Sequence, residues 1–271
     1  MKNIEDTGVQ QQSAFCIQNV ISEFIDIGKT KTEREFIRTL ILSILAGAFI
    51  AFGAYSSLLV RIGIAPGLGK FLAGIVFSTG LIMITFTGAE LFTGNILITM
   101  ALFKKKVNFL NMLKNWSIVW FGNLIGALLI AILVIFSTNH AVDYLNLVHT
   151  TALNKVNLTP LNCFISGILC NTLVCLAVYT AQCAKSAAGK ILGIVFPITT
   201  FIIAGYEHSV ANMFFIPSGI MVQNLLDDIS AQITFTAFLH NIIPVTLGNI
   251  AGAIIFVAAP LIAGHFKGCE K

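Results

Sequence analysis

Two ionisable side chains stand next to each other inside a long apolar stretch of the sequence. Glu207 and His208 interrupt the otherwise apolar run of residues 191–222. A carboxylate and an imidazole are costly at membrane depth, so their presence there indicates a functional site. An imidazole can donate a hydrogen bond or, once protonated, carry a charge. We take His208 as a candidate pore residue; the alternative is a buried neutral histidine held by backbone carbonyl groups.

The sequence pattern around Glu207 occurs twice in the chain. Residues 88–95 and 205–212 both read Gly-x-Glu-x-x-x-x-Asn, and each lies in an overlong apolar run. An untilted helix needs only about 20 residues to cross the hydrocarbon. We therefore expect two broken helices, with an irregular loop across 88–95 and a break at Gly205. The matching residues, which we expect to support the two loops, are Gly88 and Gly205, Glu90 and Glu207, and Asn95 and Asn212.

Such breaks have a defined electrostatic character. Each one exposes the amino terminus of a half-helix, with free N–H groups and a partial positive charge. Thr93 and Ser209 are suitable N-cap residues for the two second halves. Glu90 and Glu207 could hydrogen-bond freed N–H groups within their own loops. Two opposed helix amino termini near the midplane would suit an anion.

The composition is that of a membrane protein with several spans. The 271 residues are 56% hydrophobic and 10% charged, and the mean hydropathy is +0.89. A soluble domain of this size could not bury so much apolar surface. The net charge of +4 is small, so we expect no nucleic-acid partner. The six cysteines form no Cys-x-x-Cys pair, and we expect neither a metal nor a cofactor.

Six spans follow from the apolar runs, at about 36–59, 71–103, 116–136, 161–181, 191–222 and 241–263. Thirteen of the sixteen basic residues would then lie on one side, which places both termini in the cytoplasm. Residues 12–28 have helical apolar spacing and predict an amphipathic helix at the cytoplasmic surface. We divide the chain into an amphipathic segment (1–35), a six-helix channel domain (36–264) and a cytoplasmic tail (265–271).

The two halves of the channel domain, about 36–138 and 161–264, resemble each other a second time. The third span contains Gly-Asn-x-x-Gly-Ala at 122–127, and the sixth contains the same pattern at 248–253. Three spans per half is an odd number, so the repeats must be inverted in the membrane. The expected fold is all-α, with the second and fifth helices broken.

The two octets, with residues 171–177 and 243–249, resemble the formate/nitrite transporter family, and the likeness extends over about residues 12–264. The resemblance implies an aquaporin-like protomer with its own pore, assembled as a homopentamer whose central hole is closed by lipid. It implies a multi-pass protein of the prokaryotic cytoplasmic (inner) membrane, and a channel rather than an enzyme. The implied polar pore groups are Thr93, Lys155, Asn171 and His208, although from the sequence alone Lys155 is an ordinary solvated lysine in an outer loop.

Six bulky side chains are candidates for the constrictions of the pore, although composition alone leaves packing open for each of them. The resemblance implies that Phe77 and Phe201 form an outer constriction, and that Leu91 and Tyr206 lie near an inner one. The full set is Phe77, Leu81, Leu91, Phe92, Phe201 and Tyr206.

The expected function is pH-dependent passage of a small monovalent weak-acid anion. An anion that crosses apolar rings must lose its water, and taking up a proton removes most of that cost. We expect His208 to donate or relay this proton, with formate or nitrite as substrate. Glu90 and Tyr206 resemble the nitrite branch of the family, whereas Ile243-Pro244 resembles the formate branch. The alternatives are a hydrosulfide channel of the same fold and, in a different class, a neutral-solute aquaporin-like channel.

Overall fold

The computed structural model describes residues 17–137, 141–227, 229 and 231–265. Six helices in this part of the chain are long and apolar enough to cross a membrane, which confirms the expected number of spans. Five of them are α2 (Phe36–Leu59), α3 (Pro66–Thr87), α6 (Phe109–Ser137), α8 (Pro160–Cys183) and α9 (Ala187–Ala204). The sixth combines α11 (Phe235–Ala253), a π turn (Ile254–Ala258) and α12 (Ala259–His265).

The second and fifth spans are broken, as the sequence predicts. The second continues beyond the break as α4 (Phe92–Asn95), a 3₁₀ turn (Ile96–Ile98) and α5 (Thr99–Phe103). The fifth continues as α10 (Ser209–Val222) and a 3₁₀ turn (Gln223–Leu225). The irregular backbone is limited to residues 88–91 and 205–208, because α4 already begins at Phe92. The expected loop across 88–95 was therefore too long.

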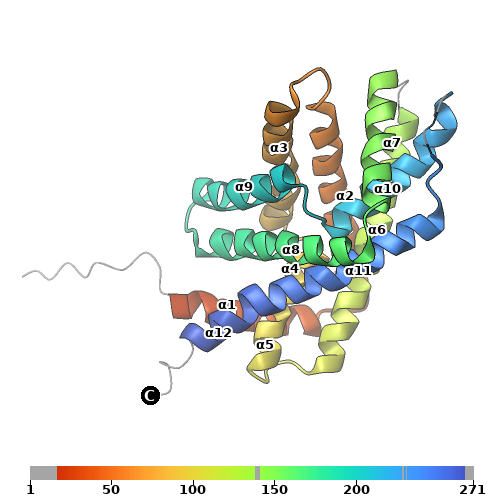
Figure 1. The fold of residues 1–271 in the computed structure, drawn as a ribbon. Helices are drawn as coiled ribbons and strands as arrows, with labels where there is room; N and C mark the ends of the chain where they lie inside the picture. The colour runs from red at the N-terminus through yellow and green to blue at the C-terminus, as the bar shows by residue number, and fades with distance from the viewer. Residues whose placement is uncertain (1–16, 138–140, 228, 230, 266–271) are drawn as a thin grey trace, which may run out of the picture.

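Two further helices flank the spans. The first, α1 (Ile17–Glu33), turns Val20, Ile21, Phe24 and Ile25 into the bundle, so it is amphipathic as predicted. The part of that prediction at residues 12–16 lies outside the described residues. The second, α7 (Val142–Val156), forms where the sequence indicated only a loop. In Figure 1, α1 and α12 lie at one end of the protein and α7 at the other.

The two halves are built on the same contacts. In the first half α2 packs along α6, in the second α8 packs along α11, and α3 packs against α9 where the halves meet. Glycines allow α2 and α6, and likewise α8 and α11, to approach each other closely. Gly126 of α6 faces the carbonyl of Ile44, and Gly252 of α11 faces the carbonyl of Ile168. The inverted repeat thus brings the two breaks together from opposite directions, and a hydrogen bond between Thr93 and His208 joins them.

Candidate functional site

Each break begins at a glycine in the left-handed backbone region. Gly88 has φ 69° and Gly205 has φ 72°, and they terminate α3 and α9. The Gly88 N–H donates to the carbonyl of Ile84 over 3.0 Å, and the Gly205 N–H donates to that of Ile202 over 3.1 Å. Glycine adopts these angles without the steric cost that a Cβ would bring. The two matching glycines of the sequence are therefore the points at which both spans stop.

We expect Gly205→Ala to destabilise the protein by about 1–2 kcal/mol, the cost of a left-handed backbone in a non-glycine residue. A Cβ at Gly205 would meet no atom within 4 Å, so the effect is one of backbone strain alone. Gly67→Ala is the matched control, because its Cβ would also meet nothing and its φ is ordinary. The melting temperature of the purified protein in detergent measures the difference. Equal melting temperatures for the two variants would contradict the strain at Gly205.

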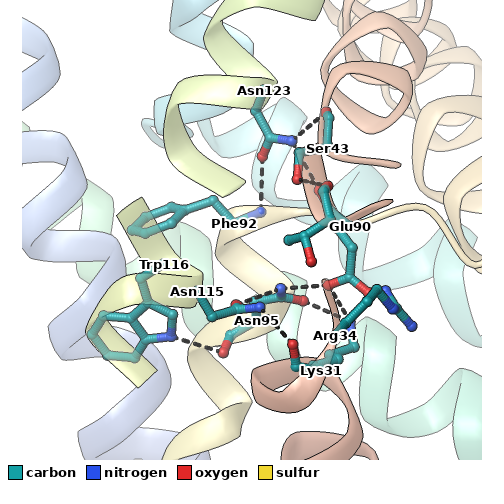
Figure 2. Close-up of polar contacts among 10 residues, drawn as sticks. Lys31, Arg34, Ser43, Glu90, Phe92, Asn95, Asn115, Trp116 and Asn123 are labelled. Atoms are coloured by element: carbon teal, nitrogen blue, oxygen red, sulfur yellow. Dashed lines mark hydrogen bonds and ion pairs between the residues drawn. The ribbon is translucent and has the colours of Figure 1, made fainter. Parts of the chain in front are cut away.

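A buried carboxylate organises the first break (Figure 2). Glu90 is 1% exposed and accepts hydrogen bonds from Lys31 Nζ at 3.0 Å and Asn95 Nδ2 at 2.6 Å, and it also pairs with Arg34. Lys31 Nζ donates in addition to Asn95 Oδ1 at 2.6 Å. Asn95 Nδ2 also reaches Asn115 Oδ1 at 3.0 Å. The loop is thereby tied to α1 through both basic residues and to α6 through Asn115.

The second break repeats this arrangement with equivalent residues. Glu207 accepts from Lys155 Nζ at 2.8 Å and from Asn212 Nδ2 at 2.6 Å. Asn212 Nδ2 also donates to Asn241 Oδ1 at 2.7 Å, and Asn241 Nδ2 donates to the Lys155 carbonyl at 2.8 Å. Lys155 of α7 thus has the place that Lys31 of α1 has in the first half. It is not the solvated lysine that its sequence context suggested, since its side chain is 15% exposed and paired.

Two asparagines, one from each half, connect the breaks to the neighbouring spans. In the first half, Asn123 Oδ1 accepts from the Phe92 N–H at 2.8 Å, and Asn123 Nδ2 donates to the Glu90 carbonyl at 2.9 Å. In the second half, Asn249 Oδ1 accepts from the Ser209 N–H at 2.9 Å, and its Nδ2 donates to the Glu207 carbonyl at 3.0 Å. These are the asparagines of the repeated Gly-Asn-x-x-Gly-Ala pattern. The sequence showed the repetition but not this role.

A hydrogen bond joins the two breaks at the centre. Thr93 Oγ1 lies 3.0 Å from His208 Nε2, and both side chains are buried. The other ring nitrogen, Nδ1, accepts from the Ala211 N–H at 3.0 Å. Because a backbone N–H can only donate, Nδ1 carries no proton here. A neutral His208 therefore has its proton on Nε2 and donates it to Thr93.

These contacts correct the expected helix caps. His208, not Ser209, is the N-cap of α10, because its ring accepts the Ala211 N–H. Leu91, not Thr93, precedes the first residue of α4, and its side chain makes no cap hydrogen bond. The Thr93 hydroxyl is therefore not used as a helix cap and bonds His208 instead.

Asn171 of α8 supports the central pair from the side. Its Nδ2 donates to the Thr93 carbonyl at 3.2 Å and to the Asn249 carbonyl at 2.8 Å. Its Oδ1 is buried and has no hydrogen-bond partner in the part of the chain that the structure describes. Asn171 thus fixes the backbone of both halves near the centre while one acceptor atom stays free.

Aromatic rings pack around the imidazole. Phe201 stacks on His208 with ring centroids 6.0 Å apart, and Phe77 meets Phe201 edge to face at 5.5 Å. Phe92 lies instead against Trp116, with centroids 6.3 Å apart, and Figure 2 shows it directed toward that ring. Phe201 therefore packs on the imidazole and Phe77 packs on Phe201, whereas Phe92 packs against Trp116 of α6.

A cavity opens on either side of the centre. The first, here called the α1 cavity, encloses about 250 Å³ and is lined by Lys31, Arg34, Leu81, Glu90 and Leu91 among others. The second, the α7 cavity, encloses about 190 Å³ and is lined by Arg61, Lys70, Lys155, Gly205 and Tyr206 among others. Neither Thr93 nor His208 lines either of these two cavities.

The two cavities also correct the expected position of one side chain. Leu91 lines the α1 cavity and Tyr206 the α7 cavity, so the expected pairing of these two at one inner constriction was wrong. The reason is the inverted repeat. Tyr206 follows Gly205 in the second break, and that break opens to the opposite side from the first.

Six membrane-length helices, two opposed broken helices and a polar contact between two cavities define a multi-pass membrane protein of the channel and transporter class. Comparison with known proteins identifies it further. The chain belongs to the formate/nitrite transporter family, whose profile matches residues 18–263. This family consists of transporters and channels, so the chain is not an enzyme.

Individual relatives match over nearly the whole chain. It is 38% identical to the "Probable formate transporter" of Methanothermobacter thermautotrophicus, over 86% of this chain and 90% of that protein. It is 36% identical to the formate channel FocA of Escherichia coli K12, over 86% of this chain and 88% of that one. A solved structure described as a pentameric formate channel with formate bound has a TM-score of 0.75 and 29% identity, over 86% and 98% of the two chains.

Proposed function

We propose that this chain is a channel for small monovalent weak-acid anions, with formate or nitrite as substrate, in a homopentamer with one pore in each protomer. The similarity to the formate channel of E. coli and to a pentameric channel with bound formate supports the substrate and the assembly. The excess of basic residues on the α1 side supports cytoplasmic termini in a prokaryotic inner membrane. The α1 cavity then faces the cytoplasm and the α7 cavity the outside.

The Thr93–His208 hydrogen bond is the observation that carries this proposal. It joins the two broken helices, and chain neighbours of its two residues line the cavities: Leu91 and Gly94 line the α1 cavity, and Tyr206 lines the α7 cavity. A solute that moves from one cavity to the other must therefore displace this hydrogen bond or pass beside it. The imidazole Nε2–H and the threonine hydroxyl are two donors that a carboxylate or nitrite oxygen could accept. A neutral solute such as water would gain less from such a pair of donors, which favours an anion over an aquaporin-like role.

Proton donation by His208 to the substrate is the proposed basis of pH-dependent flux. The hydrogen bonds of its ring determine which nitrogen must first be protonated. His208 can give a proton to the anion only after it has gained one, because its neutral Nε2–H is not acidic. The incoming proton must bind Nδ1, where the Ala211 N–H now donates at 3.0 Å. Protonation at low pH therefore has to release the cap of α10. The substrate then crosses the apolar rings as the neutral acid, which avoids most of the cost of desolvating a charge.

Flux of labelled formate into proteoliposomes, with nitrite and hydrosulfide as competitors across pH, tests the function. We expect Thr93→Val to lower formate flux by about tenfold, the loss of one buried hydrogen bond in the transition state. His208→Asn should in addition flatten the pH profile. Thr200→Val is the matched control, because its exposed hydroxyl bonds only the carbonyl of Phe196 within its own helix. Formate and nitrite flux no greater than in protein-free liposomes would overturn the proposal.

A further inference from the structure

Two of the basic side chains that line the α7 cavity have no acidic partner in the part of the chain that the structure describes. Arg61 lies in the turn after α2, and Lys70 lies near the start of α3. Their positions are linked through Gly69, since a Cβ on this glycine would stand 3.7 Å from Arg61 Cγ. Within the described part of the chain, no hydrogen bond or ion pair joins either head group to another residue. The described residues that line the cavity include no carboxylate.

The other cations of the two cavities are already compensated. In the α1 cavity, Lys31 and Arg34 both pair with Glu90. In the α7 cavity, Lys155 pairs with Glu207 at 2.8 Å and lies 5.3 Å from the centre of the Phe215 ring. An entering anion would have to compete with a buried carboxylate for any of these three. It would meet no such competition at Arg61 and Lys70.

The surroundings of Arg61 make it receptive to an anion. Its side chain is half-buried, and this burial lowers the pKa of the guanidinium from its usual value without an acid to offset the effect. A guanidinium presents a planar fork of donors that fits two oxygens of one ligand, whereas a lysine acts as a point charge. Thr151 and Asn154 of α7 add a hydroxyl and an amide to the same cavity.

We propose that Arg61 and Lys70 form an anion-binding site in the α7 cavity, which holds a carboxylate or nitrite before it reaches the Thr93–His208 pair. The site deepens the proposed function and rests on it. Formate and nitrite each offer two oxygens to the guanidinium fork, and hydrosulfide offers none, so the site selects for the former. It concentrates the anion on one side of the pore, while Lys155 holds the second break in place.

Formate flux at low substrate concentration and varied ionic strength tests this site. Salt is kept equal inside and outside the proteoliposomes, so that the orientation of the channel does not matter. Wild-type flux should fall as salt rises, because the Debye length shrinks from about 30 Å at 0.01 M to about 8 Å at 0.15 M. The double variant Arg61→Gln/Lys70→Gln should be about three- to tenfold slower at low salt and nearly insensitive to salt. Arg61→Lys, which keeps the charge and loses the fork, should lie between the two.

The matched control changes the charge equally at the other end of the protein. Lys105→Gln/Lys106→Gln removes two exposed lysines from the turn between α5 and α6, and it should leave both flux and salt dependence as in wild type. Equal salt dependence in the Arg61/Lys70 variant and wild type would overturn the site while leaving the proposed function intact. Wild-type flux at the level of empty liposomes would instead overturn the proposed function.

A binding measurement judges the site without transport. Formate should raise the melting temperature of the purified wild type more than chloride at the same ionic strength does, since a ligand that binds the folded state stabilises it. The double variant should lose most of this difference, and the lysine control should keep it. If formate and chloride act alike on the wild type, the site does not select two-oxygen anions and the proposal fails.

Discussion

Glu207→Ala is expected to destabilise the protein by about 3–5 kcal/mol, which corresponds to a fall in melting temperature of roughly 6–20 °C. Glu207 is 3% exposed and accepts hydrogen bonds from Lys155 and Asn212. Its loss would leave an ammonium group with 15% side-chain exposure and no counter-charge, and the Asn212 amide would keep only one of its two acceptors. An uncompensated charge in such a place costs far more than the deleted contact contributes.

Two further variants identify the cause of this loss. The double variant Glu207→Ala/Lys155→Met should recover a large part of the lost stability, because Lys155→Met removes the ammonium group that Glu207→Ala leaves without a partner. Glu33→Ala is the surface control, since Glu33 pairs with Lys29 at 3.9 Å and is 62% exposed, and pairs of this kind contribute about 0–1 kcal/mol. If Glu207→Ala melts like Glu33→Ala, the buried pair does not hold the break together.

Signals that are local in the sequence were sufficient for most of the fold. The lengths of the apolar runs gave the six spans, and the two octets marked both breaks, because Gly88 and Gly205 are the residues that stop their helices. The repeated pattern in the third and sixth spans indicated the inverted repeat. Each of these signals lies within a short stretch of residues, so it can be recognised in the sequence without knowledge of tertiary contacts.

The helix α7 could not be predicted in the same way. Val142–Val156 carries Asp143, His149 and Lys155, so it lacks the continuous apolar run that marks a span. It is stabilised mainly by its packing against α10, which begins more than fifty residues later in the chain. The equivalence of Lys155 with Lys31 was hidden for a related reason. Their carboxylate partners lie 52 and 59 residues away in sequence.

The prediction of Thr93 and Ser209 as N-caps was wrong because tertiary contacts satisfy the helix ends. N-cap preferences describe helix ends at which a nearby side chain must satisfy the first N–H groups. At these buried breaks the Phe92 and Ser209 N–H groups donate to Asn123 and Asn249 of neighbouring spans. A local hydroxyl is therefore not needed. The central contact between Thr93 and His208, 115 residues apart, is likewise a product of the fold and not of any local pattern.

Gly126→Ala and Gly252→Ala are expected to be the most damaging changes among small residues. A Cβ at Gly126 would overlap the Ile44 carbonyl and lie 2.8 Å from the Ala48 nitrogen, and one at Gly252 would overlap the Ile168 carbonyl. These neighbours are backbone atoms, so α2 and α6, or α8 and α11, would have to separate. Overpacking typically costs roughly 1–3 kcal/mol of stability, and we expect each variant to lose about 3 kcal/mol or more. The melting temperature and the fraction of folded protein measure this loss.

Gly94→Ala is the control for this prediction, because its Cβ would meet only Val178 Cγ2 at an ordinary 3.7 Å. Separation of α2 from α6 would also move Asn123, which connects Phe92 and Glu90 to the third span. Gly126→Ala should therefore reduce formate flux per folded protein as well as stability, whereas Gly94→Ala should leave stability unchanged. A Gly126→Ala protein that melts and conducts like wild type would show that the close helix contact does not position the break.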